Sequence, residues 1–332
     1  MNTIATLPAE KRQALFRQTA EKTNMTEQIV EKDFWVCWVL KNIFESSLKE
    51  KLIFKGGTSL SKVYGIIERF SEDIDLILNW AHNPIGEPME NRSKNKTREF
   101  NERLLAWSNK CIEDEIYPTV AQFCDGICKT TLHHTKNGDA IILILYPQAF
   151  PMDQYLRPEI KLEIGALAAW DPHKSATIVP YAAEQYPHIF QQKKATVEVT
   201  TAERTFWEKA TILHAEAGRP EGNRFRERYA RHYYDLVMMA RNKQLKETAL
   251  QNPALLKKVV EFKQRFYSGS AWCAYPDAKQ GTFRLLPPAH FLPSLAKDYE
   301  EMKNMIYGEY PDLATILHEL TQLQEEINKI SQ

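Results

Sequence analysis

The sequence predicts an α+β protein, with a mixed sheet and flanking helices in its first part and mainly helices after that. Short runs of alternating apolar and polar residues, typical of strands, occur between about residues 51 and 200. Asn137-Gly138 lies between two β-rich runs and predicts a hairpin turn. Beyond residue 200 the apolar residues recur at helical spacing. We therefore expect two domains, residues 1–200 and residues 201–332.

Composition limits the classes of partner. The 332 residues include 43 basic and 43 acidic side chains, so the formal net charge is zero and contact with a polyanion requires a local basic cluster. No run of eighteen apolar residues is present, and the N-terminus lacks the apolar stretch of a signal peptide. The five cysteines are scattered and odd in number. We expect a cytoplasmic protein that does not contact a membrane.

The elements of the first domain follow from local signals. Thr26 is expected to cap a helix, Thr58 or Ser59 to begin another, and Pro118 to end a long one. In chain order, the expected elements are helices over 9–23 and 27–44, a strand over 51–55, a short helix, a strand over 73–79, a helix from 93 to about 117, a hairpin over 127–147, and strands over 157–167 and 195–200.

The second domain is expected to begin with a helix behind a threonine cap. This helix stops near Gly218, where a basic connector begins. The helical pattern resumes in "YYDLVMMARNK", and two further helical segments are expected, roughly over 246–267 and 294–330.

Two acids in the strand over 73–79 predict a cation site. Side chains two positions apart in a strand project from the same face, so Asp73 and Asp75 point towards one place. Two ionised carboxylates that lie close together repel each other unless a cation lies between them. A hard divalent ion such as Mg²⁺ or Mn²⁺ binds carboxylate oxygens in this way. The alternative is that Asp73 and Asp75 simply lie at a solvent-exposed strand end and bind no cation.

A glycine-rich turn precedes the acid pair. Gly56 and Gly57 allow backbone N–H groups to approach a ligand, and the helix that follows directs its unpaired N–H groups at an anion. We expect Gly56, Gly57, Thr58 and Ser59 to bind the phosphates of a nucleoside triphosphate (NTP). The turn is not a P-loop, because "GGTSLSK" lacks the G-x-x-x-x-G-K-[ST] pattern.

The stretch "GGTSLSKVYGIIERFSEDIDLIL" resembles the first motif of the polymerase-beta-like nucleotidyltransferase superfamily, GG[ST] followed by DxD. "RFSEDIDL", together with "VEKDFWVCWVLKNIF", "ERTFWEKATILHA" and "RHYYDL", resembles the AbiEii/AbiGii-like abortive-infection toxins over about residues 26–237. The resemblance implies a metal-dependent transfer of a nucleoside monophosphate from an NTP to an acceptor hydroxyl. It further implies a bacterial toxin of a type IV-like toxin–antitoxin system for phage defence, with a cognate antitoxin and the 3′ end of tRNA as acceptor.

The resemblance also suggests roles for later residues. Glu159, Lys161 and Glu163 alternate onto one strand face, and the superfamily pattern favours Glu163 as the third metal-binding acid, with Glu159 as the alternative. Lys161 would support a phosphate or an acid, unless the face is merely an exposed row of Glu-Lys-Glu pairs. Lys209, by itself an ordinary helical lysine, corresponds to a lysine that grips the phosphates of the nucleotide. Asp235 corresponds to a late acid near the active site, and its role is to orient a cation, to transfer a proton or to form a helix ion pair.

The basic connector "GRPEGNRFRERYARH" is the expected RNA contact. Its arginines outnumber its acids, and interleaved aromatic residues can stack on bases. The alternative is a soluble loop. The arginines are Arg219, Arg224, Arg226, Arg228 and Arg231.

Two alternatives to an RNA-modifying enzyme remain open. One keeps the chemistry but modifies a protein hydroxyl, as AMP-adding relatives do. The other is a nucleotide-binding module that catalyses nothing, although such a module does not need to hold two repelling carboxylates together.

Overall fold

The computed structural model describes residues 1–71, 73–81, 83–151, 158–166, 169–267 and 270–329. The chain divides into two compact units. Unit 1 comprises residues 1–64, 70–88 and 98–200, and unit 2 comprises residues 65–69, 89–97 and 201–332. The division into a domain of residues 1–200 and a domain of residues 201–332 stays a prediction. The predicted α+β fold class is confirmed, because a mixed sheet in unit 1 is combined with many helices.

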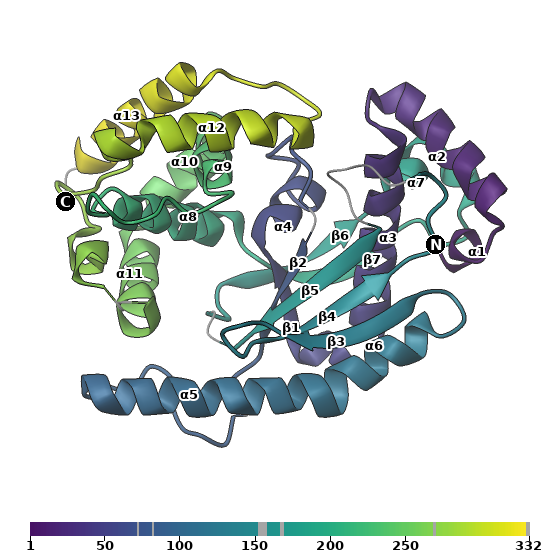
Figure 1. Ribbon diagram of the computed structural model, residues 1–332, viewed down its shortest axis with the longest axis horizontal. Helices are drawn as coiled ribbons and strands as arrows, with labels where there is room; N and C mark the ends of the chain where they lie inside the picture. The colour runs from purple at the N-terminus through teal and green to yellow at the C-terminus, as the bar shows by residue number, and fades with distance from the viewer. Residues whose placement is uncertain (72, 82, 152–157, 167–168, 268–269, 330–332) are drawn as a thin grey trace. The chain divides into compact units, whose positions relative to one another are not determined.

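A seven-stranded sheet forms the centre of unit 1 (Figure 1). Its strand order is β3-β4-β5-β2-β1-β7-β6. The pairs β2–β5 and β1–β7 are parallel and the other neighbouring pairs are antiparallel, so the sheet is mixed. The strands are β1 (Leu52–Lys55), β2 (Asp73–Leu78), β3 (Lys129–His134), β4 (Ala140–Leu145), β5 (Glu159–Gly165), β6 (His173–Ile178) and β7 (Ala195–Thr200).

One face of this sheet is apolar. Val199, Phe54, Leu76 and Ile164 are aligned across four neighbouring strands by the register, and all four are buried. Helix α3 (Glu27–Glu45) packs against β7 and β5. Each such apolar side chain stabilises the fold by about 1.5–3 kcal/mol on full burial. Because successive side chains alternate, their neighbours along the strands project from the opposite face.

The helices of unit 1 flank the sheet. Thr26 caps α3 as expected, since its hydroxyl accepts a hydrogen bond from the Ile29 N–H at 3.3 Å. The first four residues of α5 belong to unit 2 and the rest to unit 1. Besides α3, the helices are α1 (Asn2–Ala5), α2 (Ala9–Thr23), α4 (Gly56–Lys62), α5 (Lys94–Cys111), α6 (Tyr117–Cys124) and α7 (Tyr181–Gln185).

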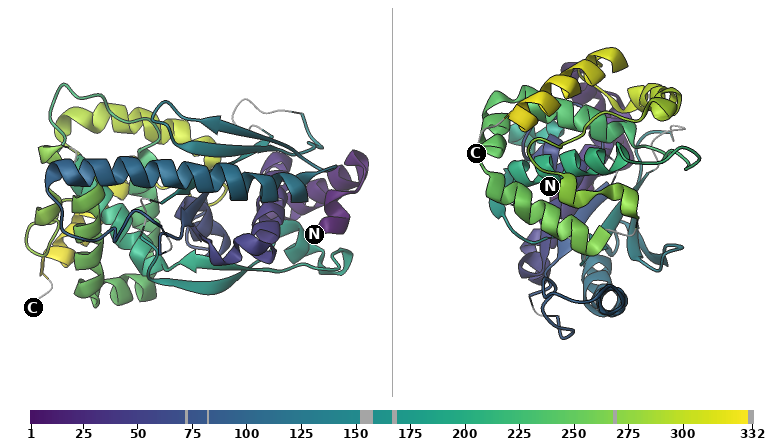
Figure 2. Two further views of the ribbon diagram at one scale, coloured as in Figure 1. Left: turned by 90° about the horizontal axis from the view of Figure 1, so that it is seen from below. Right: turned by 90° about the vertical axis from the view of Figure 1, so that its left-hand side faces the viewer.

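The predicted end of the long helix at Pro118 is wrong. Helix α5 passes through a π-helical turn, Ile112–Ile116, directly into α6, and Pro118 is the second residue of α6 (Figures 1 and 2). Proline is tolerated in the first turn of a helix, where its missing N–H has no partner to lose. The π turn resets the hydrogen-bond pattern there, so the chain remains helical.

Unit 2 is helical. Thr201 caps α8, accepting a hydrogen bond from the Arg204 N–H at 3.4 Å, and α8 packs against α9, α10 and α11. Within the part of the chain that the structure describes, none of the helices is both long and apolar enough to cross a membrane. The helices are α8 (Ala202–Glu216), α9 (Ala230–Arg241), α10 (Lys243–Leu250), α11 (Pro253–Tyr267), α12 (Leu292–Met302) and α13 (Leu313–Lys329).

Candidate active site

The polar face of the sheet brings together five charged residues. Asp75 lies opposite Lys55 on β1 and opposite Glu163 on β5, while Asp73 lies opposite Lys161. Directly paired residues of neighbouring strands project to the same side. Asp73, Asp75, Lys161 and Glu163 therefore share one face, and all four are half-buried. We call these four residues and Lys55 the acid face.

Lys161 experiences the negative charge of this face. Its ammonium forms an ion pair with Glu163. Burial lowers the pKa of Lys161, but the hydrogen bond to Glu163 and the charges of Glu163, Asp73 and Asp75 outweigh burial and raise it. All three acids thus act on the same cation, so the face holds positive charge between its carboxylates.

The register separates the two candidates for the third acid. Glu163 lies directly opposite Asp75. Glu159 lies two residues before Lys161, whose partner Asp73 is the first residue of β2. Glu163 is therefore level with the acid pair, whereas Glu159 lies beyond the start of β2. This geometry favours Glu163 over Glu159.

The residues present fit a divalent cation in part. No group of three or more His, Cys, Asp or Glu side chains gathers closely enough to hold a metal within the described ranges. Asp73 and Asp75 nevertheless offer carboxylate oxygens, the ligands that Mg²⁺ prefers, on one half-buried face that already attracts an ammonium group. Glu163 is the exception, because its carboxylate forms an ion pair with Lys161.

Gly56 brings the glycine turn against the acid pair. Its φ is +82°, in the left-handed region that favours glycine. A Cβ atom at this position would lie 1.9 Å from Asp75 Oδ2, where no second atom fits. The backbone of the turn therefore touches the carboxylate of Asp75, and this contact requires glycine.

The two hydroxyls of the turn are buried and directed inwards. Helix α4 begins at Gly56, two or three residues before the predicted start at Thr58 or Ser59. Thr58 Oγ1 donates to the carbonyl oxygen of Asp73 at 2.6 Å, and Ser59 Oγ donates to the carbonyl oxygen of Gly56 at 2.8 Å. Both side chains are less than 5% exposed. They stabilise the turn and the start of β2 through these hydrogen bonds to backbone carbonyl oxygens.

Unit 2 contains a buried ionic cluster around Asp235. Arg69 donates to Asp235 through Nε at 2.6 Å and through Nη2 at 2.8 Å, and Lys209 Nζ lies 2.7 Å from the same carboxylate. Burial by itself raises the pKa of Asp235, but the charges and hydrogen bonds of Arg69 and Lys209 outweigh burial and hold it well below its usual range. Asp235 is therefore ionised and orients both cations.

For the pKa of Lys209, burial outweighs the charge of the partner carboxylate. Burial lowers its pKa, Asp235 raises it, and the positive charges of Arg69 and Arg231 lower it further, so the net direction is downward. Sequence reasoning found Lys209 and Asp235 but missed Arg69. The feature of the sequence that could have identified Arg69 is its position in the motif "RFSEDIDL", four residues before Asp73.

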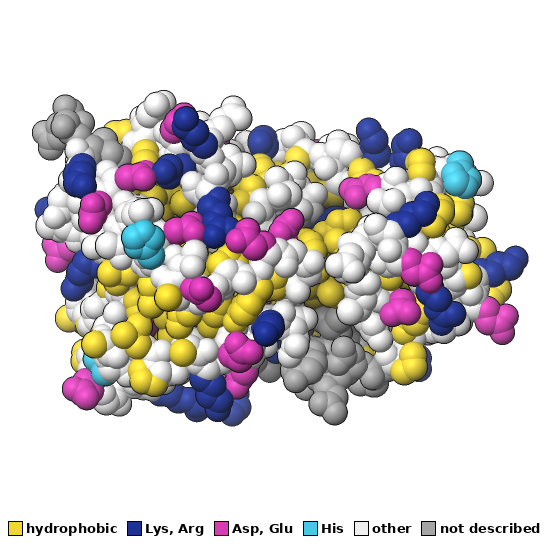
Figure 3. Space-filling model, turned by 90° about the horizontal axis from the view of Figure 1, so that it is seen from above, with side chains coloured by type: hydrophobic (Ala, Val, Ile, Leu, Met, Phe, Trp, Pro, Cys, Tyr) yellow, Lys and Arg dark blue, Asp and Glu magenta, His cyan; other side chains and the backbone are white. Residues whose placement is uncertain are grey.

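The arginines of the basic connector differ in their surroundings. Arg219 is buried, donates to both carboxylate oxygens of Glu216 at 2.6 and 2.7 Å, and lies 4.4 Å from the ring centre of Trp272. Arg231 is half-buried, whereas Arg224, Arg226 and Arg228 are exposed. On the face drawn in Figure 3, acidic and basic side chains are interspersed, as expected from their equal numbers.

A mixed sheet that carries a DxD pair against a glycine turn is the arrangement that the sequence resemblance predicts for a nucleotidyltransferase. The family model described as "Nucleotidyl transferase AbiEii toxin, Type IV TA system" matches residues 38–324. The chain belongs to this family of nucleotidyltransferase toxins, as the sequence resemblance indicated.

Beyond the family model, the similarity to known proteins is low. Among solved structures, the chain is similar to MenT4, a nucleotidyltransferase toxin from Mycobacterium tuberculosis H37Rv. The TM-score is 0.41 at 14% sequence identity, and the match covers 87% of this chain and 98% of that one. No curated protein sequence matches the chain.

Proposed function

We propose that this nucleotidyltransferase transfers a nucleoside monophosphate from an NTP to an acceptor hydroxyl and releases pyrophosphate. The observation that carries the proposal is the contact between the Gly56 backbone and the Asp75 carboxylate. It joins a turn suited to phosphates to an acid pair suited to a divalent cation.

Asp73 and Asp75 would hold Mg²⁺ or Mn²⁺, with Glu163 completing the set when its carboxylate leaves Lys161. Divalent cations in such a site stabilise the charge on the attacking and departing oxygens of a phosphoryl transfer. Lys161 would then be free to bind a phosphate oxygen. The Lys161 ammonium would thus offset the negative charge of the acids before the substrate binds, and the negative charge of a phosphate after it binds.

In this proposal, the turn and Lys209 would each stabilise negative charge on the nucleotide. Backbone N–H groups of Gly56 and Gly57 would bind the phosphates, and the Thr58 and Ser59 hydroxyls keep that turn in place through their bonds to backbone carbonyl oxygens. Lys209 would neutralise the growing negative charge on the pyrophosphate. In that role Asp235 and Arg69 act as positioning residues for its ammonium.

The acceptor in this proposal is RNA, with the 3′ end of tRNA as the specific candidate. Exposed Arg224, Arg226 and Arg228 would contact its phosphates, together with Arg231, and the aromatic ring of Tyr229 beside Arg226 offers a surface for stacking. Arg219 would hold the connector in shape through Glu216 rather than contact RNA directly. A cognate antitoxin is the expected protein partner, as the type IV family implies.

The test is incorporation of label from each NTP into total tRNA in the presence of Mg²⁺. The wild type is expected to incorporate label, and Asp75→Ala is expected not to. Glu163→Gln and Glu159→Gln form a matched pair on one strand face, and only Glu163→Gln is expected to lose activity. Equal incorporation by the wild type and Asp75→Ala would refute the proposed role of the acid pair. Label in protein rather than in RNA would favour the protein-modifying alternative.

A further inference from the structure

A pocket lies in unit 1 where β2 ends, on the line of the acid face. Residues 73, 75 and 77 alternate onto that face, and Asn79 continues the line beyond the end of the strand. The Asn79 N–H donates to the Lys51 carbonyl oxygen at 2.8 Å, so the pairing of β2 with β1 extends to Asn79. The pocket has a volume of about 360 Å³, which is in the range of small-ligand sites.

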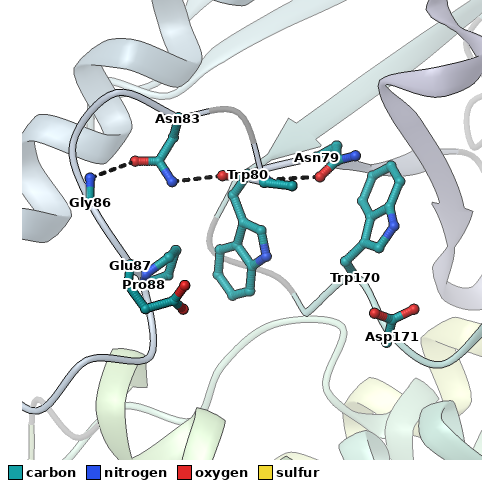
Figure 4. Close-up of a pocket in the computed structure, with 9 residues that line it drawn as sticks. Asn79, Trp80, Asn83, Gly86, Glu87, Pro88, Trp170 and Asp171 are labelled. Carbon is teal, nitrogen blue, oxygen red and sulfur yellow. Dashed lines mark hydrogen bonds between the residues drawn. The ribbon is translucent and has the colours of Figure 1, made fainter.

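Two tryptophans contribute aromatic rings to the lining. Figure 4 shows the indole groups of Trp80 and Trp170 on either side of Asn79. Trp170 packs on Ile53 and Ile77, which project from the same sheet face as Asp75. The pocket and the acid face therefore lie along the same side of β2, with Ile77 between them, and Asn79 follows Asp75 by about 13 Å along the strand direction.

The polar part of the lining favours an uncharged ring with hydrogen-bonding edges. Glu87 and Asp171 contribute carboxylates, and the described lining includes neither lysine nor arginine, so a phosphate group is disfavoured here. Carboxylate oxygens accept several hydrogen bonds each, including those of exocyclic amino groups. Asn79 accepts from the Ala81 N–H at 2.9 Å through its side-chain oxygen (Figure 4), so its amide nitrogen is the donor that it adds to the lining.

The loop beside Trp80 is shaped by Asn83. Its side-chain oxygen accepts from the N–H groups of Ile85 at 2.9 Å and Gly86 at 3.1 Å, and its nitrogen donates to the Trp80 carbonyl oxygen at 2.6 Å. Three hydrogen bonds from one side chain hold the wall of the pocket in place. Such a held wall loses little conformational freedom when a ligand binds, which lowers the entropic cost of binding.

We propose that this pocket binds a nucleobase of the substrate, stacked on an indole and hydrogen-bonded by Asn79, Glu87 and Asp171. The inference rests on the proposed function, since it is the acid face that makes a nucleotide the expected ligand. The base belongs either to the NTP or to the end of the acceptor strand. Both sources present the same planar, uncharged ring.

Binding can be measured with nucleosides, which carry no phosphate and do not need the acid pair. In protein labelled with ¹⁵N-tryptophan, adenosine, cytidine, guanosine and uridine are titrated without metal, with ribose as the control that has no base. We expect the indole N–H signals of Trp80 and Trp170, identified by Trp80→Phe and Trp170→Phe, to shift in a saturable way. Trp107, a half-buried tryptophan on α5, should stay unmoved. Shifts that are absent, or that ribose reproduces, overturn the proposal.

Variants then test the stacking contact. Trp80→Ala is expected to weaken nucleoside binding about tenfold, and Trp80→Phe, which keeps an aromatic face, to weaken it far less. Trp107→Ala is the matched control and should bind as the wild type does. Unchanged affinity in folded Trp80→Ala overturns the proposal. If that variant does not fold, the indole shifts of the wild type decide the matter alone.

Kinetics with Trp80→Ala identify the source of the base. A tenfold higher KM for the NTP places the base of the NTP in the pocket, whereas a higher KM for the RNA places the base of the acceptor there. Both results support the proposal, and unchanged KM values for both substrates overturn it. Asp75→Ala should still bind nucleosides. A failure of the transfer reaction is therefore distinguishable from a failure of the pocket.

Discussion

Replacing Gly56 by alanine should abolish transfer at a modest cost in stability. The new Cβ would lie 1.9 Å from Asp75 Oδ2, whereas real Cβ atoms stay at least 3.0 Å away, so the carboxylate must retreat by more than 1 Å. A displacement of about 1 Å in a reacting group can cost about 10²-fold in rate. The positive φ of +82° adds a backbone penalty of about 1–2 kcal/mol, because alanine disfavours this region.

Gly138→Ala is the matched control for Gly56→Ala. Gly138 lies in the β3–β4 turn with a φ of +88°, and a Cβ there meets no atom within 4 Å. Both variants should therefore lose about 1–2 kcal/mol of unfolding free energy in urea, but only Gly56→Ala should lose at least about 10²-fold in kcat/KM for label incorporation. Normal kcat/KM in a folded Gly56→Ala variant would show that the position of the Asp75 carboxylate does not matter for the reaction.

Three further expectations concern charges. Lys161→Met removes the ammonium that competes with a cation, so Mg²⁺ should raise the Tm of this variant more than that of the wild type; an equal rise contradicts this reasoning. Arg69→Met removes one of the two buried cations that pair with Asp235, and it should lower the unfolding free energy in a urea titration by about 3–5 kcal/mol. Lys257→Met, which removes an exposed ion pair, is the control and should change the unfolding free energy by less than about 1 kcal/mol. Burial lowers the pKa of His214 from 6.5 to about 4. The unfolded chain therefore binds a proton at this histidine more readily than the folded chain, and the unfolding free energy should fall by about 3 kcal/mol as the pH falls from 6.5 towards 4. His214→Gln should flatten this part of the plot of unfolding free energy against pH.

The part of the site that could be predicted from sequence follows from strand periodicity. Alternation alone puts Asp73 and Asp75 on one face, and the same rule aligns Lys161 with Glu163. The pairing of β2 with β5 joins residues far apart in the chain. The sequence therefore could not predict that Glu163 lies directly opposite Asp75, which the strand register shows. Local pattern determines the face of a residue, whereas its partner across the sheet depends on the whole chain.

The orientation of the turn hydroxyls could not be predicted in the same way. A threonine after two glycines is compatible both with a hydroxyl that binds phosphate and with one that bonds to the backbone. The structure has the second arrangement, because the carbonyl oxygen of Asp73 lies within reach of Thr58. Arg69 was missed for a related reason, since its partner Asp235 is 166 residues away in the chain.

The formal charges of the acid face fit the cation site proposed above. Asp73, Asp75 and Glu163 carry three negative charges, and Lys55 and Lys161 carry two positive ones, so the face retains an excess of one negative charge. Like charges on neighbouring positions of a sheet destabilise it. A sequence selected only for stability would replace one acid by a neutral residue, as in the common trade between stability and activity. The proposed divalent cation would offset this formal charge, beside a glycine that both its φ of +82° and its contact with the Asp75 carboxylate require.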